Sequence, residues 1–538
     1  MTRSNKADRR IATSAVGSIL LLLSAYPPHR LRAQASPSGA AQTIDTVVVV
    51  SKNVFPAGEA DAPGFIARLA NALHVTTRPS VIHRLLLVSP GDPYDSARVA
   101  ESERALRAMN VFSRVRVDST RVDGRLALRV LTTDGWSTKP QLGYSSAGGD
   151  VSWLVGMVEE NLLGTASTLR AVYNRTPDRS ILSLEYLNQH FVGRRAQLDL
   201  GYQNLSDGRK GQWLFGVPFY ETAAHTALAT NGEAASERIL VFRDGALDTT
   251  FARRALRVGV TGGWAVRATS RGYVRVWYGA HWRREDFAAE TASAIPRSLF
   301  ASAGAGVELS HVRFQVLERF NSYARREDVD LSQTLRLGVW AAPRAWGYPA
   351  GRAGAGPEAR AQLSALWPRG FALLQGQANG IYTGAGLDSG RVRAGVTVAS
   401  QNLPRQTLIL HLEGGALERT RPGSEFDLWL DKRGPRVFGV HEFTGTRMAW
   451  LALEDRILVT DELWGLVGVG LAPFLDWGGA WYADEGSRLG GDVGIALRLG
   501  PTRAVRGDVG EIALGYRFGA GFRPGSRWAV AVRKGVAF

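Results

Sequence analysis

The chain has 538 residues and a formal net charge of +16, and it contains no cysteine. This length predicts at least two structural units, and the lack of cysteine excludes disulfides, thiolate metal sites and cysteine nucleophiles. The basic residues are dispersed and form no stripe, so the charge does not predict nucleic-acid binding. Arginines that line a polar lumen or meet anionic lipid headgroups explain the charge better.

The N-terminus has the pattern of a secretory signal. Four basic residues come first, namely Arg3, Lys6, Arg9 and Arg10. An apolar stretch follows over residues 11–25, and Ala33-Gln34-Ala35 is a small-x-small cleavage site. We therefore predict a signal peptide over residues 1–35 and export of the mature chain. The alternative is an uncleaved anchor helix.

Residues 43–138 predict a small α/β domain. A strand over residues 46–50 precedes three segments with helical spacing, over residues 65–73, 79–86 and 96–109. Asp95 or Ser96 is a candidate cap of the last helix. Two alternating strands then flank Asp123-Gly124, which is a strong hairpin signal. This order, together with Pro90-Gly91-Asp92-Pro93-Tyr94, resembles a polypeptide-transport-associated (POTRA) domain.

Residues 139–538 predict a transmembrane antiparallel β-barrel, so the chain is expected to be mainly β. Apolar and polar residues alternate repeatedly, as in residues 196–203, 256–261, 392–398 and 511–518. A soluble sandwich also alternates. Charged arginines on the inward parity and aromatic residues near strand ends favour a barrel in lipid. Dividing 400 residues at about 25 per strand and connection predicts sixteen strands.

Three sequence blocks in the barrel region resemble the BamA/TamA outer-membrane assembly family. The first, Glu160-Asn161-Leu162-Leu163-Gly164, is similar to the start of the first barrel strands of that family. The second contains Arg436-Val437-Phe438 and, further on, Glu454 and Arg456. It resembles an Arg-Gly-aromatic loop motif followed by a strand with an inward glutamate.

Val437 departs from the second motif, because it stands where the family has glycine. A shifted alignment on Val437-Phe438-Gly439-Val440 keeps the glycine but loses the arginine. We prefer the first alignment, since the later residues of the block then match without a gap. A valine cannot easily adopt a positive φ, so the geometry of the loop tip stays open.

The third block, Phe474-Leu475-Asp476-Trp477-Gly478, matches the family's Phe-x-Asp-x-Gly strand motif. Alternation places Phe474, Asp476 and Gly478 on one face. The resemblance implies that Asp476 pairs with Arg436 inside the lumen, with Glu454 nearby. A guanidinium offers bidentate geometry to such a carboxylate. The alternative is that each residue is a solvated lumen charge.

The last strand resembles the C-terminal signal that the barrel-assembly machinery reads. Alternate positions back from the terminus are apolar or aromatic, with Lys534 as the exception: Phe538, Val536, Val532, Val530 and Trp528. The alternative is an ordinary last strand that ends on phenylalanine.

Motifs of catalysis and of metal or cofactor binding are not found. The nine histidines show no HExxH spacing, and no GxSxG or Walker sequence is present. His441-Glu442 is interpreted as loop surface. We expect no catalytic, metal or cofactor site, and we expect that the chain is not an enzyme.

The resemblance implies a factor of the bacterial outer membrane with a periplasmic POTRA domain. Such a factor assembles or inserts outer-membrane proteins, or translocates polypeptide, through a barrel seam. Its implied partners are the lipid bilayer, unfolded outer-membrane or secreted polypeptides, and periplasmic accessory proteins. The alternative function is a passive or structural barrel or pore without insertase activity.

Overall fold

The computed structural model describes residues 42–53, 74–109, 111–147, 149–191, 195–289, 298–323, 326–348, 353–429, 433–464, 467–502, 509–520 and 526–534. The compact unit described below is Ile44–Phe538. The predicted signal peptide, the predicted helix over residues 65–73, and Val536 and Phe538 of the C-terminal signal lie outside the described residues.

The small domain contains a three-stranded sheet in the order β1-β3-β2. Its elements are β1 (Thr46–Lys52), α3 (Pro79–Leu85), α4 (Ser96–Ala108), β2 (Phe112–Val122) and β3 (Arg125–Asp134). Asp95 caps α4, because its side chain accepts hydrogen bonds from the Ala97 and Arg98 amides. The helices and the sheet share one apolar core, in which Ile82, Leu106 and Leu128 are fully buried. The order strand, helices, strand, strand agrees with the prediction, while the POTRA assignment stays a prediction.

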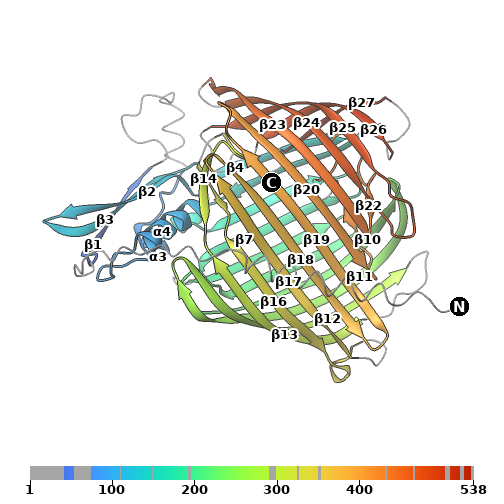
Figure 1. Ribbon diagram of the computed structural model, residues 1–538, viewed down its shortest axis with the longest axis horizontal. Helices are drawn as coiled ribbons and strands as arrows, with labels where there is room; N and C mark the ends of the chain where they lie inside the picture. The colour runs from blue at the N-terminus through green and yellow to red at the C-terminus, as the bar shows by residue number, and fades with distance from the viewer. Residues whose placement is uncertain are drawn as a thin grey trace. The chain divides into compact units, whose positions relative to one another are not determined.

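The remaining strands form a closed antiparallel barrel, which confirms the predicted architecture. Figure 1 shows these strands running side by side, tilted around a common axis. In chain order they are β4 (Thr138–Ala147), β5 (Asp150–Glu159), β6 (Thr168–Arg175), β7 (Ser180–Phe191), β8 (Ala196–Leu205), β9 (Gly208–Val217), β10 (Thr226–Arg243), β11 (Ala246–Thr269), β12 (Gly272–Ala289), β13 (Ser298–His311), β16 (Gln333–Ala342), β17 (Gly354–Trp367), β18 (Gly370–Thr383), β19 (Gly386–Ser400), β20 (Gln406–Glu418), β23 (Arg447–Leu463), β24 (Val467–Trp481), β25 (Gly490–Pro501), β26 (Gly510–Gly519) and β27 (Trp528–Lys534).

The predicted number of sixteen strands is wrong, because the described residues form a barrel of twenty. The estimate allowed long connections on one side of the barrel. Several connections are in fact two-residue turns, as between β8 and β9, β10 and β11, β11 and β12, and β17 and β18. Each strand with its connection therefore uses fewer residues than assumed. The same length of chain forms more strands, and more strands close a wider barrel.

The two surfaces of the barrel differ in polarity. On β8, Leu200 and Tyr202 point outward and are about half exposed. Similar apolar residues cover the outside of the other strands, for example Val155, Leu184, Leu374, Ile495 and Leu514. The inward parity carries the ion pairs described below. An apolar exterior on a closed sheet suits a hydrocarbon environment, because pairing between neighbouring strands satisfies most backbone hydrogen bonds internally.

Two connections between barrel strands carry structure of their own. β14 (Phe314–Glu318) and β15 (Arg326–Asp330) form a hairpin between β13 and β16. The loop between β20 and β23, residues 419–446, contains the short pair β21 (Phe426–Asp427) and β22 (Thr444–Gly445). Two short 3-10 turns, η1 (Leu162–Gly164) and η2 (Arg344–Trp346), complete the elements. In the part of the chain that is described, no helix is long and apolar enough to span a bilayer.

Candidate functional site

The contact between the first and last barrel strands is much shorter than any other in the described barrel. β27 and β4 are joined by one residue pair, Val532 with Ser146. Every other pair of neighbouring barrel strands has at least seven residue pairs, as in β26 with β27 and β5 with β6. The barrel therefore has a seam with little backbone pairing between β4 and β27.

The first barrel strands are β4, which begins at Thr138, and β5, and they pair over ten residues. The Glu160–Gly164 block, which resembles the start of the first barrel strands of the family, follows these two strands. Alternation is weak in β4, where proline, glycine and serine occupy several positions. Leu142, on the β4 segment that pairs with no described residue of β27, is 76% exposed.

The Glu160–Gly164 block instead joins the barrel to the small domain. Asn161 is buried, and its side-chain amide donates to the Val75 carbonyl at 2.8 Å and to the Thr77 hydroxyl at 3.0 Å. Its Oδ1 accepts a hydrogen bond from the Ala166 amide at 2.9 Å. Glu160 pairs with Lys139 at the start of β4. This turn holds the start of β4 and the end of β5 against the segment that precedes α3 in the small domain.

Beside the seam, Arg436 of the loop between β20 and β23 is buried against the barrel wall. Its Nε donates to Asp476 Oδ2 at 2.5 Å and its Nη2 to Asp476 Oδ1 at 3.0 Å. Its Nη1 donates to Glu454 at 3.0 Å and to Glu511 at 2.7 Å. The guanidinium lies 3.9 Å from the ring centre of Phe474. The structure thus brings together Arg436, Asp476, Glu454 and Phe474 in a bidentate, fully desolvated arrangement.

Three more arginines and one more carboxylate complete this buried cluster. Arg456 donates to Glu454 at 2.6 Å, and Arg498 lies 3.9 Å from the same residue. Arg533 of β27 donates to Glu511 at 3.4 Å. Asp492 accepts from the Val437 amide at 2.8 Å. The cluster thus contains four guanidinium groups and four carboxyl groups, so each buried cation has carboxyl groups close by.

Val437 fills the position where the family motif has glycine, and the structure shows how the loop accommodates it. Val437 is fully buried among Phe474, Ala513 and Ala531, which line the inner wall of the last strands. It is not among the residues with positive φ; that conformation is adopted by His441 instead, with a φ of 58°. The substitution therefore places an apolar contact on β27 without straining the loop.

His441 and Glu442 were interpreted as loop surface, and this interpretation is wrong, because both are buried. The His441 ring stacks on Phe242 with 3.6 Å between centroids. Its Nε2 lies 2.8 Å from Asp178, and its Nδ1 is hydrogen-bonded with Asp427. Burial lowers the pKa of His441, but the hydrogen bonds with Asp178 and Asp427 outweigh it and raise the pKa to about 9. His441 thus anchors the loop as a cation.

The remaining predicted residues have structural positions near this loop. Phe438 is buried against Phe443, with 5.1 Å between ring centroids. Gly478 is required by close packing, because an added Cβ would lie 2.4 Å from the Ala449 carbonyl oxygen. Trp528 and Val530 of β27 face outward and are more than half exposed, while Val532 forms the seam pair.

Sequence reasoning missed Glu511 and Asp492. Both lie on the inward parity of the last strands, so alternation was the signal that identifies them. Among the described residues, no group of His, Cys, Asp and Glu has the arrangement of a metal site.

Over part of its length, the sequence of this chain is similar to that of a known outer-membrane protein assembly factor. No family model matches the chain. The outer membrane protein assembly factor BamA of Neorickettsia risticii (strain Illinois) is 27% identical over 146 residues, which is 26% of this chain and 19% of that protein. The match thus spans about a fifth of that relative. It confirms the resemblance to the BamA/TamA family that the motifs indicated.

Three solved structures resemble the chain at low sequence identity. CdiB from Escherichia coli shares 11% identity, covering 99% of both chains, with a TM-score of 0.46. CdiB from Acinetobacter baumannii shares 9% identity over 91% of this chain and 73% of that chain, with a TM-score of 0.46. BamA from Haemophilus ducreyi lacking POTRA domains 1–3 shares 11% identity over 92% of this chain and 84% of that chain, with a TM-score of 0.35.

Proposed function

We propose that this chain is a factor of the bacterial outer membrane that inserts barrel strands into the membrane or passes polypeptide across it, through the seam between β4 and β27. The single residue pair at this seam is the observation that carries the proposal. The small domain acts as a periplasmic POTRA domain that receives the client polypeptide. The proposed activity uses backbone hydrogen bonding and needs no catalytic group.

The seam supplies what an incoming strand needs. β4 pairs with β5 along its whole length, but on the side of β27 the backbone groups of residues 138–145 have no partner strand among the described residues. Exposed strand edges recruit other strands, because an unpaired polar group in hydrocarbon is costly. A client β-strand that pairs with β4 satisfies these groups by β-augmentation.

The loop between β20 and β23 (residues 419–446), called the internal loop from here on, supports an opening of the barrel at the seam. Val437 packs on Ala531 of β27, and the Val440 amide donates to Asp150 of β5 at 3.2 Å. The loop therefore contacts the wall on both sides of the seam. The internal loop therefore helps to hold β27 and β5 in place, although β27 and β4 share only one residue pair.

A disulfide across the seam tests the proposal. In Ser146→Cys/Val532→Cys the two new thiols face each other on β4 and β27. The chain contains no other cysteine, so the crosslink is unambiguous. We expect the oxidised protein to lose most of its ability to fold a client barrel into lipid vesicles, and reduction of the same sample to restore it.

A second disulfide provides the matched control. Ser145→Cys/Ser152→Cys crosslinks β4 to β5, a pair that is already joined over ten residues. Oxidation of this variant should leave client folding unchanged. Equal activity of the locked and open seam would rule out the lateral route. A steady ion conductance without any effect on client proteins would favour the passive pore instead.

A further inference from the structure

The β14–β15 hairpin lies on the inner face of the barrel wall at the end that meets the small domain. Leu317, Phe320 and Leu331 pack on Phe371, Ala399 and Ile409, which belong to β18, β19 and β20. All six side chains are nearly or fully buried. This apolar core fixes the position of the hairpin on the barrel wall. The polar groups at the two ends of the hairpin are therefore held in defined positions.

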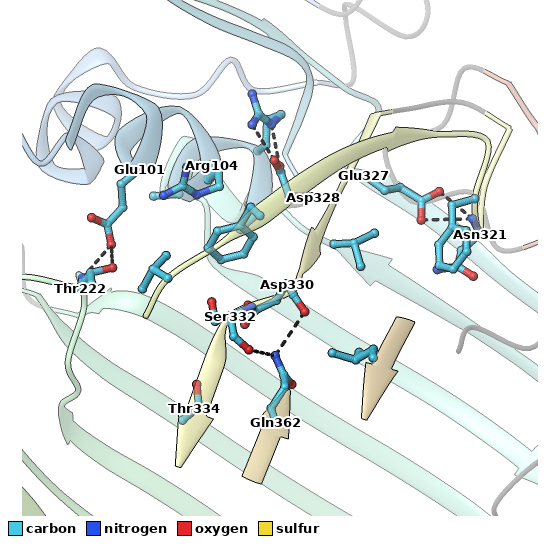
Figure 2. A pocket seen from close by; sticks show the side chains of 18 of the residues that line it. Glu101, Arg104, Thr222, Asn321, Glu327, Asp328, Asp330, Ser332, Thr334 and Gln362 are labelled. Carbon is cyan, nitrogen blue, oxygen red and sulfur yellow. Dashed lines mark hydrogen bonds and ion pairs between the residues drawn. The ribbon is translucent and has the colours of Figure 1, made fainter. Parts of the chain in front are cut away.

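One end of the hairpin contacts the small domain. Arg107 of α4 donates to Asp328 from Nε at 2.8 Å and from Nη2 at 2.9 Å. One helical turn away, the Arg104 guanidinium lies 4.5 Å from the ring centre of Phe314. Figure 2 shows Arg104 and Asp328 together at the edge of a lumen cavity of about 2350 Å³. α4 is therefore bound to the hairpin by a bidentate ion pair.

The tip of the hairpin is held in a defined conformation. Glu327 accepts from the Asn321 amide at 2.9 Å and from the Ser322 amide at 2.8 Å, and Figure 2 shows the Glu327–Asn321 contact. Tyr323 lies over glycines of β24 and β25, where an added Cβ at Gly470 would approach the Tyr323 hydroxyl to 2.3 Å. The hairpin thus reaches from α4 to the strands that carry the buried cluster.

The tip contacts that cluster directly. Arg456 donates from Nη1 to the Phe320 carbonyl at 2.5 Å and to Asn321 Oδ1 at 3.2 Å. The same guanidinium donates from Nε to Glu454 at 2.6 Å. Glu454 uses its other oxygen to accept from Arg436 at 3.0 Å. An unbroken chain of contacts therefore runs from α4 through the hairpin to the internal loop.

We propose that the β14–β15 hairpin couples the small domain to the internal loop, so that a change at the contact of α4 with Asp328 alters how firmly Arg436 holds the loop beside the seam. This inference rests on the proposed function in one respect: the coupling would link the arrival of a client at the small domain with the seam. The physical basis of the coupling does not depend on that function. Arg456 binds both the hairpin tip and Glu454, so displacement of the tip moves Glu454, which is an ion-pair partner of Arg436.

Hydrogen–deuterium exchange of the full chain in lipid nanodiscs tests the coupling, with no client present. In Asp328→Asn the hairpin loses the charge that Arg107 binds. We expect amides of residues 433–446 to exchange about fivefold faster, the lower end of usual coupling between sites. Arg107→Lys removes the bidentate geometry and should act in the same direction if Asp328→Asn fails to fold.

Glu221→Gln is the matched control, because Glu221 is another barrel partner of α4. It lies 3.4 Å from Arg98 and does not touch the hairpin. This variant also weakens a contact between α4 and the barrel but should leave exchange of residues 433–446 unchanged. Equal acceleration in both variants, or acceleration in neither, overturns the coupling. Since exchange needs no client, the coupling and the proposed insertion activity can fail separately.

Reciprocity gives a second readout. Because coupling between two sites acts in both directions, Arg436→Met should also speed exchange in α4 if α4 and the loop are coupled. Unchanged exchange in α4 would also overturn the proposal.

Discussion

At the scale of single residues, Arg436 decides how the internal loop is held. Its side chain is 1% exposed and contacts three carboxylates from three different strands. A cation in this position is stabilising only because its partners surround it. Removing it leaves Asp476, Glu454 and Glu511 with less compensating charge in a space that water does not reach.

We therefore expect Arg436→Met to destabilise the barrel by about 3–5 kcal/mol, the usual cost of breaking a buried ion pair. Urea unfolding in detergent micelles measures this change. Arg170→Met is the control, because Arg170 lies 3.5 Å from Glu185 on the lumen side and both side chains are more than a third exposed. That substitution should cost less than about 1 kcal/mol. Equal costs would mean that burial of the Arg436 cluster has no energetic consequence.

The stabilisation of the internal loop by His441 depends on pH. Its pKa is raised to about 9, above the usual value of about 6.5. The stabilisation is therefore fully present below pH 6.5 and is lost as the pH rises through 9. We expect a nitroxide on Ser424→Cys in the same loop to gain mobility between pH 8 and 10.

His441→Gln removes the titrating group and should abolish this pH dependence, leaving the nitroxide mobile at every pH. The chain has no native cysteine, so the label reports on one site. A transition centred below pH 7, or one that persists in His441→Gln, would contradict the assignment.

At the scale of elements, the sequence predicts several strands because alternation is a local property. β8 and β26 follow the expected parity, and their apolar residues Leu200 and Leu514 face outward. Alternation gives little contrast between the two faces of β4, because proline, glycine and serine occupy several of its positions. The sequence also indicates Asp95 or Ser96 as the cap of α4, and the structure shows that Asp95 is the cap. Capping, too, depends only on neighbouring residues.

The candidate site could be predicted only in part, because its contacts join distant segments. The family resemblance indicates Arg436, Glu454 and Asp476, and the structure brings them together. Nothing local indicates that Arg456 binds the Phe320 carbonyl, which lies 136 positions away in the chain. His441 likewise packs on Phe242 of β10 and is hydrogen-bonded with Asp178 of the turn between β6 and β7, and both partners are distant in the chain. Such contacts depend on strand number and register, and the strand number was misjudged.

At the scale of the whole unit Ile44–Phe538, the small domain is bound to several turns at one end of the barrel. Asp95 accepts from Ser270 at 2.9 Å, Glu101 accepts from the Thr222 amide at 2.7 Å, and Arg195 donates to the Leu86 carbonyl at 3.1 Å. Figure 2 shows the Glu101–Thr222 contact beside the cavity. These contacts lie on the turns that join β7 to β8, β9 to β10 and β11 to β12, so the small domain is held along one arc of the barrel end. If a client polypeptide binds the small domain as proposed, it lies next to both the lumen and the hairpin.

The difference between the two barrel surfaces gives a test of the membrane assignment itself. Leu200 lies in the middle of β8 and is 44% exposed on the outer face, whereas Gln203 of the same strand points inward. Leu200→Arg should destabilise the protein in phosphatidylcholine vesicles by about 2–4 kcal/mol, because the charge enters hydrocarbon. Gln203→Arg places the same charge in the polar lumen and should change stability by less than about 1 kcal/mol. Urea unfolding in vesicles measures both variants. If Leu200→Arg were as stable as Gln203→Arg, the outer face of β8 would not lie in lipid, and a seam in that wall would have no membrane into which to release a client strand.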